Sequence, residues 1–211
     1  MTKTDSLDDW LSTQPTKVHR RSKRLMEVVR DAYPIGVPAL IVKSQTDRLG
    51  DSGGYAFHLG TPDDVLRRIC SWLLTHGEES VLLELVQELW KRHGREDVAL
   101  AALLLANLQT VGNVWIQLGE LIGASSTAEA LLLSIEECLR AKHEEPGEEL
   151  LVDWCQRSLA HSHLALLVCH AAWIRAKRPP LSPVLMDLFR NIDYPDGDSL
   201  LVRVRDQMLN S

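Results

Sequence analysis

The run from Ala99 to Ala106 constrains the fold most, because every residue in it is apolar. A helix without a polar face has to be buried between other helices, so the chain is expected to stack helices in layers. The surrounding residues predict three successive helices between Thr61 and Leu108, of which this run forms the third.

Start and stop signals delimit these three helices. Thr61-Pro62 followed by two acids is typical of a helix start, in which the hydroxyl caps free amides and the acids lie at the positive end of the helix dipole. Gly77 is expected to end the first helix and His93-Gly94 the second. Arg95-Glu96-Asp97 is expected to begin the third.

Beyond Leu108 the apolar residues recur at spacings of three or four, which indicates further helices and no convincing strand. The expected helices cover approximately residues 114–122, 128–141, 148–159, 163–177, 183–189 and 199–209. Helix pairs recur at intervals of about 40 residues, which is the period of HEAT repeats. The predicted fold class is therefore all-α, a HEAT-like α-solenoid of antiparallel helix pairs.

Two regions are expected along the chain. Residues 1–54 comprise a loose arm or short docking helix, then a basic helix and a glycine-rich linker. Residues 55–211 form the helical array, with capping helices at its C-terminal end. The basic helix is expected to begin at Lys17 and to end near Pro34. Residues 39–42 form either a short helix or an extended piece.

Composition restricts the partners and the compartment. The formal net charge is −6, so the chain as a whole does not attract phosphate, and any contact with nucleic acid needs a local basic surface. The four cysteines lie in apolar helical patterns without a Cys-x-x-Cys pair, which suits buried, reduced thiols. No apolar run reaches membrane-spanning length, and the first residues do not form a secretory leader. The expectation is a soluble cytoplasmic protein.

Two motifs carry a resemblance to a known family. The segment Tyr55–Pro62 followed by Leu66-Arg67, and then Glu88-Leu89-Trp90 followed by Arg95-Glu96, resembles the DNA alkylation repair family of HEAT-like (AlkD-like) glycosylases. The resemblance covers about residues 55–178. It implies a HEAT-like fold and a concave basic cleft that holds damaged DNA against two tryptophans and a catalytic aspartate.

The chain departs from the family pattern at the catalytic motif. Of the family's Trp-Trp-Asp sequence only Trp115 is present, while Ile116 replaces the acid and Gly119 replaces a second acid. A cleft arginine of the family falls near Leu167. Glu120 lies one turn from Ile116 and is the candidate substitute for the missing carboxylate, since without an acid nothing stabilises a developing sugar cation. The resemblance therefore implies the fold rather than the chemistry.

The densest positive cluster is the basic segment, residues 17–24, which contains five cations and no acid. It is either a solvated helix face or a patch that contacts phosphates. The residues expected to contact nucleic acid are Lys17, Arg20, Arg21, Lys23, Arg24, Arg67, Arg68 and Trp115.

No catalytic, cofactor-binding or metal-binding residue is predicted. The cysteines and histidines between residues 155 and 170 are spaced too widely for a structural zinc site. The sequence has no Gly-x-Ser-x-Gly elbow, and cysteines in apolar helices stay protonated and inert.

Two hypotheses for the function follow. The first is a non-catalytic HEAT-like scaffold that docks a protein partner or double-stranded DNA on its concave or basic surface. The alternative is a DNA glycosylase with a rearranged active site. A basic surface shared by several helix cations would favour DNA, whereas arginines beside acids would favour a protein partner. The cations concerned are Arg67, Arg68, Lys91, Arg92, Arg157 and Arg175.

Overall fold

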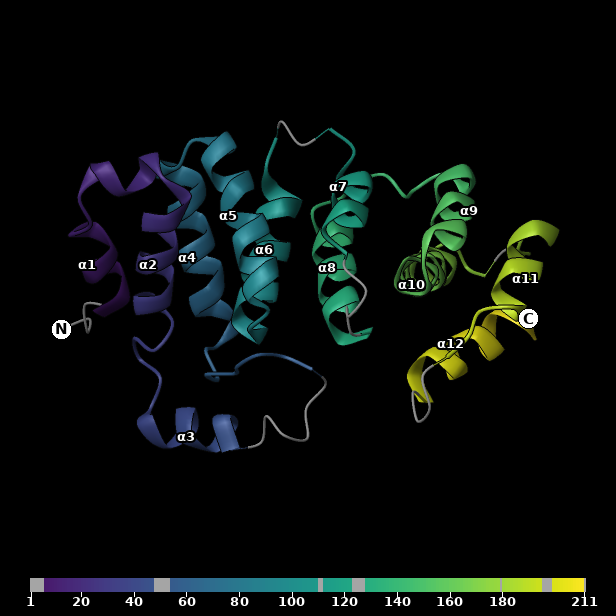
Figure 1. Cartoon of the computed structure of the whole chain (residues 1–211), viewed down its shortest axis with the longest axis horizontal. Coiled ribbons are helices and arrows are strands. Elements are labelled where there is room, and N and C mark those ends of the chain that lie inside the picture. Colours follow the sequence, from purple (N-terminus) through teal and green to yellow (C-terminus); the bar gives the residue numbers. More distant parts are fainter. Residues whose placement is uncertain are drawn as a thin grey trace. The chain divides into compact units, whose positions relative to one another are not determined.

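Every regular element that the structure describes is a helix, which confirms the predicted all-α class (Figure 1). The computed structural model describes residues 6–47, 54–109, 112–122, 128–178, 180–194 and 199–210, and no strand occurs among them. No helix within these ranges is long and apolar enough to cross a membrane.

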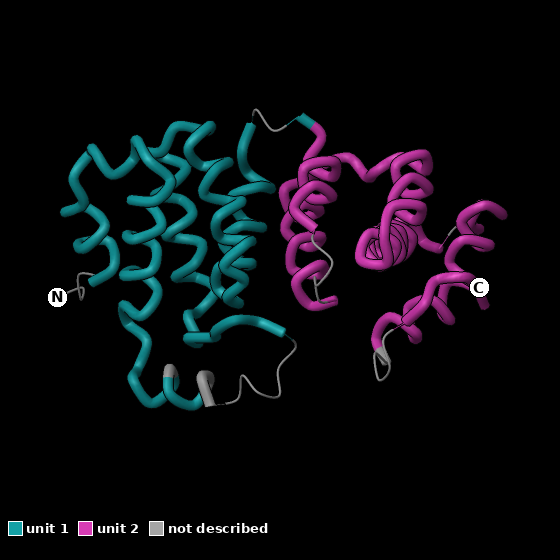
Figure 2. The backbone as a smooth tube through the Cα atoms, viewed as in Figure 1, with its two compact units in different colours: residues 1–112 teal, residues 113–211 magenta. Residues whose placement is uncertain are grey.

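The chain forms two units, residues 1–112 and residues 113–211 (Figure 2). This division differs from the boundary that the sequence suggested after residue 54. The reason is that the buried face of the helix Ser22–Ala32 packs on the helix Glu79–Arg92, so the basic segment belongs to the same unit as the helices that follow it.

Unit 1 is built around the apolar helix that the sequence singled out. Its elements are α1 (Ser6–Ser12), the 3₁₀ helix η1 (Thr16–Arg20), α2 (Ser22–Ala32), α3 (Ala39–Asp47), α4 (Asp63–His76), α5 (Glu79–Arg92) and α6 (Arg95–Asn107). The three helices expected between Thr61 and Leu108 are α4, α5 and α6. Helix α6 packs against both α4 and α5, and every residue from Glu96 to Ala106 is buried.

The N-terminal elements differ in detail from the expectation. Helix α1 docks on the unit through Leu7 and Leu11, which are both buried, so it is not a loose arm. The expected basic helix is two elements, because Arg21 adopts an extended backbone (φ −149°, ψ 126°) between η1 and α2. Residues 39–47 form α3, with Leu40 exposed.

Residues 55–61, here called the strap, cross the corner between α5 and α6 without regular structure. Two backbone hydrogen bonds hold the strap to the corner: Ala56 N–H donates to the His93 carbonyl at 2.8 Å, and Arg95 N–H donates to the Phe57 carbonyl at 2.9 Å. The close approach requires glycine at position 94, because a Cβ there would lie 2.0 Å from the Phe57 ring.

Glu96 is fully buried and holds the far end of the strap. Its Oε1 accepts hydrogen bonds from the backbone N–H groups of Leu59 and Gly60, each at 2.9 Å, and of Thr61 at 3.3 Å. The expected cap at Thr61 is wrong, since Pro62 occupies the cap position of α4. The Thr61 hydroxyl instead donates to the Tyr33 carbonyl at 3.0 Å, which ties the strap to the end of α2.

Asp97 is also fully buried and links α2, α5 and α6. Its carboxylate accepts hydrogen bonds from the Tyr33 hydroxyl at 2.9 Å and from the Arg92 guanidinium at 2.5 and 2.6 Å. Burial raises the pKa of Asp97, although the bonds from Arg92 and Tyr33 oppose that shift. Burial likewise raises the pKa of Tyr33 well above its ordinary value, and Asp97 raises it further.

Unit 2 is built around one long helix. Its elements are α7 (Val114–Leu121), α8 (Ala128–Arg140), α9 (Glu148–Arg157), α10 (Leu159–Arg175), α11 (Pro183–Arg190) and α12 (Ser199–Leu209). Helix α10 packs against α8, α9 and α12. The turn between α9 and α10 is Ser158 alone, in an extended conformation (φ −158°, ψ 166°), rather than the expected residues 160–162. Residues 160–162 lie within α10.

Candidate functional site

The basic segment presents five exposed cations: Lys17, Arg20, Arg21, Lys23 and Arg24. None of them forms an ion pair with a described residue. The segment is held in place by its apolar neighbours, since Val18 of η1 and Leu25 of α2 are buried. The positive charges are therefore free for a partner while their backbone is fixed.

The residues of the short helix η1 lie on three distinct faces. A 3₁₀ helix has about three residues per turn, so residues three apart share a face. Thr16 and His19 lie on one face, Lys17 and Arg20 lie on the next, and Val18 points into the core. Two of the free cations thus lie directly beside the face that carries His19.

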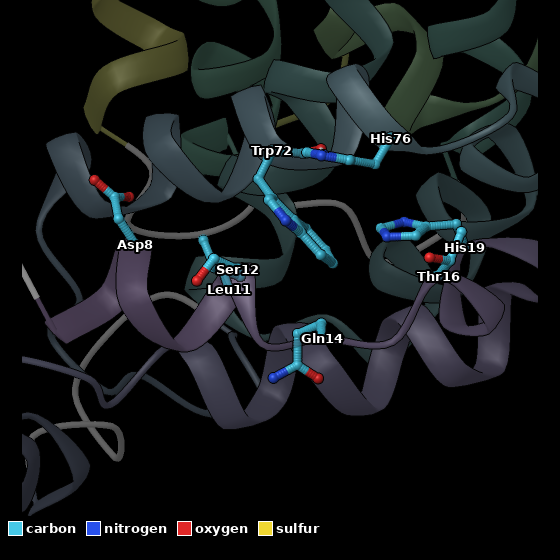
Figure 3. A pocket seen from close by; sticks show the side chains of 8 residues that line it. All are labelled: Asp8, Leu11, Ser12, Gln14, Thr16, His19, Trp72 and His76. Carbon is cyan, nitrogen blue, oxygen red and sulfur yellow. The ribbon is translucent and has the colours of Figure 1, made fainter.

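Thr16 and His19 line a pocket of about 520 Å³ that α1, η1 and α4 enclose (Figure 3). In Figure 3 the Trp72 indole extends from α4 into the space beside the His19 ring. The other residues that line the pocket are Asp8, Leu11, Ser12, Gln14 and His76. The pocket brings together residues that lie up to 68 positions apart in the chain, between Asp8 and His76.

Three rings form the aromatic wall of this pocket. The ring centroids of His19 and Trp72 are 4.7 Å apart, those of His19 and His76 are 5.4 Å apart, and those of Trp72 and His76 are 5.6 Å apart. His76 Nδ1 bonds to the Trp72 carbonyl oxygen at 2.9 Å, which fixes the orientation of that imidazole.

His19 has a buried ring nitrogen without a hydrogen-bond partner in the described structure. The residue is only 7% exposed, and its Nδ1 has no hydrogen-bond partner among the described residues. Burial lowers the pKa of His19, and the neighbouring His76 lowers it further. The imidazole is therefore neutral at neutral pH, with one donor and one acceptor nitrogen. Buried polar groups are usually satisfied, so an unsatisfied nitrogen on a residue that lines the pocket is a candidate contact for a ligand.

Four of the six helix cations named above, Arg67, Arg68, Arg92 and Arg157, are paired with carboxylates, whereas Lys91 and Arg175 are exposed and form no ion pair with a described residue. Arg67 bonds to Asp63 and Arg68 to Asp8, both at 2.8 Å. In the same way, as described above, Arg92 bonds to Asp97. In unit 2 Arg157 lies between Asp153, at 2.7 Å, and Glu120, at 3.2 Å. By the criterion stated above, these four arginines beside acids favour a protein partner at their positions, and in this they differ from the basic segment.

Trp115 lies in the core rather than on a binding surface. The residue is 2% exposed, and its indole N–H donates to the Glu144 carbonyl at 2.6 Å. It therefore has no free ring face for a base, in contrast to the expectation that it contacts nucleic acid.

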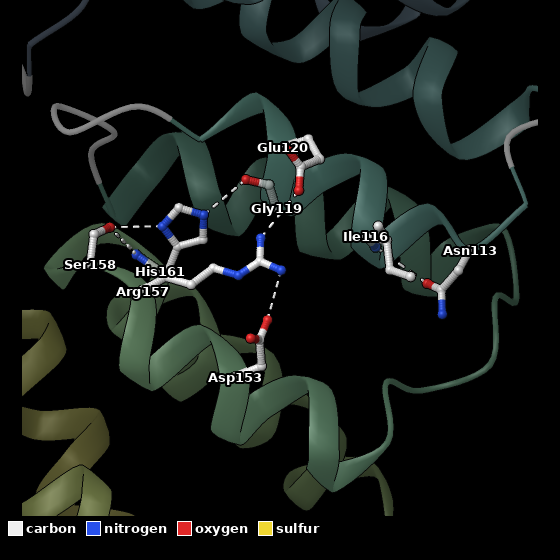
Figure 4. Close-up of polar contacts among 8 residues, drawn as sticks. All are labelled: Asn113, Ile116, Gly119, Glu120, Asp153, Arg157, Ser158 and His161. Carbon is white, nitrogen blue, oxygen red and sulfur yellow. Dashed lines mark hydrogen bonds and ion pairs between the residues drawn. The ribbon is translucent and has the colours of Figure 1, made fainter.

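The two substituted acid positions lie in different environments on α7 (Figure 4). Ile116 is exposed. Gly119 packs against the Trp154 indole, and a Cβ at this position would lie 2.8 Å from the indole nitrogen. An acidic side chain does not fit at position 119, which gives a physical reason for the glycine.

Glu120, the candidate substitute acid, belongs to an exposed ion-pair cluster (Figure 4). Its side chain is 66% exposed and bonds to Arg157. A carboxylate that stabilises a sugar cation acts best where water is excluded and no counter-charge competes. Glu120 is instead exposed to water and paired with a cation, so its position does not suit this role.

Sequence reasoning overlooked a contact between Ser158 and His161 (Figure 4). His161 Nδ1 lies 2.7 Å from the Ser158 hydroxyl, and His161 Nε2 lies 3.0 Å from the Gly119 carbonyl oxygen. With Nε2–H donating to that carbonyl, Nδ1 accepts from the serine hydroxyl. Ser158 also accepts the His161 backbone N–H at 3.4 Å as the cap of α10. The pair therefore joins the start of α10 to α7, and its signal is a Ser-x-x-His sequence at a helix start.

The histidines and cysteines considered as metal ligands do not share a site within the described structure. His163 Nε2 bonds to the Asp193 carbonyl at 2.9 Å, and His170 Nε2 bonds to Gln207 at 3.2 Å. Burial raises the pKa of Cys155 to about 11 and that of Cys169 to about 12, so both thiols are protonated at neutral pH. Within the described ranges no three His, Cys, Asp or Glu side chains are placed to hold a metal ion.

Comparison of the chain with protein-family models, with curated proteins and with solved structures finds no match. The resemblance to the alkylation repair family stays a prediction from residues 55–67 and 88–96.

Proposed function

We propose that the protein is a non-catalytic helical scaffold, HEAT-like in the arrangement of its helix pairs, and that it binds double-stranded DNA through the basic segment. The observation that carries this proposal is the contrast between two sets of cations. Five side chains of the basic segment are exposed and form no ion pair with any residue that the structure describes, whereas Arg67, Arg68, Arg92 and Arg157 are bonded to carboxylates. Unpaired cations on a fixed backbone are what a phosphate chain contacts.

Charge and aromatic residues together favour nucleic acid over an acidic protein. The net charge of the chain is −6, so the basic segment is a local positive site on a negative molecule. Beside it lies a pocket with Trp72 and two imidazoles in its wall. Cations that follow a phosphate chain next to aromatic rings are typical of surfaces that bind nucleic acid.

A fluorescence-anisotropy titration with duplex DNA at several salt concentrations tests the proposal. Each neutralised phosphate contributes about −0.9 to the slope of log K against log salt, so five contacts give a slope of about −4 to −5. Replacing Lys17, Arg20, Arg21, Lys23 and Arg24 with alanine should abolish the salt-dependent binding and leave the helical content unchanged, because all five are exposed.

A matched control removes five exposed cations elsewhere. Replacing Lys43, Lys91, Arg175, Arg190 and Arg203 with alanine changes the net charge equally but leaves the basic segment intact. This control should keep most of the affinity. Equal loss in both variants would mean that net charge alone drives binding. Absence of binding at low salt would overturn the proposal and direct the search to protein partners.

A further inference from the structure

We propose that the pocket between α1, η1 and α4 binds one unpaired nucleobase of a strand whose phosphates lie on the basic segment. This inference rests on the proposed function of the basic segment as a phosphate site, and it adds an unpaired base, from a single strand or displaced from a duplex, as the ligand of the adjoining pocket. Four features of the pocket support it: its size, its aromatic wall, the free nitrogen of His19 and the adjacent cations.

The size and wall of the pocket suit a flat heteroaromatic ring. Its volume of about 520 Å³ lies within the range of about 300–1,000 Å³ that is typical of small-ligand sites. The Trp72 indole projects into it beside the His19 ring (Figure 3). Bases that are not stacked in a duplex bind to such rings by stacking, whichever base is present.

The polar groups of the pocket suit the edge of a base. Nδ1 of His19 is buried and has no partner within the described structure, although the residue lines the pocket. A base edge carries both N–H donors and carbonyl or ring-nitrogen acceptors, so it can pair with this nitrogen in either tautomer of the imidazole. The nitrogen is closed off from solvent, so this contact requires the His19 ring to turn toward the pocket. Asp8 is the acid among the lining residues, and its bond to Arg68 at 2.8 Å compensates its charge.

Two cations of the basic segment adjoin residues that line the pocket. Lys17 and Arg20 follow Thr16 and His19 directly on the adjoining face of η1. A base in the pocket therefore brings its sugar-phosphate chain onto free cations. A base that is paired inside a duplex cannot enter, because its faces and its pairing edge are occupied.

The experiment compares two single-stranded probes of equal length, an oligothymidylate and an abasic oligomer with the same phosphates. The wild-type protein should bind the oligothymidylate roughly tenfold more tightly, as one stacked base allows. Trp72→Ala and His19→Ala should remove this preference and leave the affinity for the abasic oligomer unchanged. Trp10→Ala, which changes a half-buried indole outside the pocket, should keep the preference.

A second readout covers the case in which Trp72→Ala fails to fold. Trp72→Phe keeps a ring in the wall and should retain most of the preference. Quenching of tryptophan emission by the oligothymidylate should be present in the wild type and reduced in Trp72→Phe.

The outcomes separate this inference from the proposed function. Equal affinity of the wild type for both probes, or a preference that survives both pocket variants, would overturn the base site alone, provided that the basic-segment variant still loses binding. Failure of the wild type to bind either probe or duplex DNA at low salt would overturn both.

Discussion

Burial of His19 makes the stability of the folded protein depend on pH. Burial and the neighbouring His76 lower the pKa of His19 in the folded protein, whereas in the unfolded chain the group has its ordinary pKa near 6.5. Between these two values the unfolded chain binds more protons than the folded one. The free energy of unfolding therefore rises with pH in that window, and the contribution of His19 is lost as the pH falls from about 6.5 through the folded pKa.

We expect the variant His19→Gln to show a shallower loss of stability on acidification than the wild type. The reason is that glutamine carries no proton to be taken up by the unfolded state. Urea denaturation at several pH values between 7 and 5 measures the slope directly. Identical slopes in the two proteins would show that the imidazole of His19 reaches solvent freely.

The bond between Arg92 and Asp97 leads to a second prediction at this scale. Asp97 is fully buried and its pKa is already raised by burial, so its charge depends on the Arg92 guanidinium. Arg92→Ala should reduce the free energy of unfolding by roughly 3 kcal/mol, because it leaves a buried carboxylate without its partner. In a double-mutant cycle, Asp97→Asn should recover part of that loss. Additive effects of the two substitutions would contradict the coupling.

Single residues also mark the limit of what the sequence predicts. Thr61 and Glu96 both match local helix-start patterns, but each makes its decisive contacts with residues far along the chain. Glu96 accepts amides from the strap, about 36 positions earlier. Local spacing reveals a cap three residues away, whereas a partner at this distance appears only when the fold brings the two segments together.

Helices were predicted best where their apolar faces repeat. Helices α4, α5 and α6 lie close to the expected positions, and so do α11 and α12. The breaks at Arg21 and Ser158 were missed or misplaced because each needs only one extended residue, without glycine or proline. A single change of backbone dihedral leaves no periodicity signal.

Truncation of Trp90 in α5 tests the packing of unit 1. The residue is 7% exposed, so Trp90→Ala should lower the free energy of unfolding by about 3–5 kcal/mol, as for other buried aromatic residues. Chemical denaturation monitored by circular dichroism measures the change. A stability equal to that of the wild type would mean that α5 does not bury this face.

The corner between α5 and α6 leads to a prediction about the strap. A Cβ at position 94 would overlap the Phe57 ring, so Gly94→Ala should destabilise the protein by roughly 1–3 kcal/mol through overpacking. In Phe57→Ala the same glycine substitution should be nearly neutral, because the ring that it would strike is gone. Comparable losses in both backgrounds would place the cause in the backbone rather than in the ring.

At the scale of the whole molecule, the division into two units predicts separable behaviour. Residues 1–112 contain the basic segment, the pocket and their own buried core. A fragment with these residues should fold to a helical spectrum and bind duplex DNA with the salt slope of the full chain. A fragment with residues 113–211 should not bind. Loss of folding in the first fragment would show that unit 1 depends on the rest of the chain.

The site was predictable in part. The cations of the basic segment stand next to one another in the sequence and were recognised there. The pocket beside them was not, because Asp8, His19 and Trp72 come from three separate elements. The motif predicts that Trp115 contacts nucleic acid, yet burial of an indole depends on the packing around it.

The rate at which a buried thiol reacts with an alkylating reagent reports how often the helices around it open. Cys70 is buried in unit 1, and Cys138 and Cys169 are buried in unit 2 with pKa values raised to about 12. Cys155 of unit 2 is only half-buried, and burial raises its pKa to about 11. An alkylating reagent can modify the three buried cysteines only after the surrounding helices have opened, whereas Cys155 is expected to react earlier. Pulsed alkylation followed by mass spectrometry would therefore time the opening of each unit separately, and a nucleic acid that binds unit 1 should slow modification of Cys70 while leaving the other three unaffected.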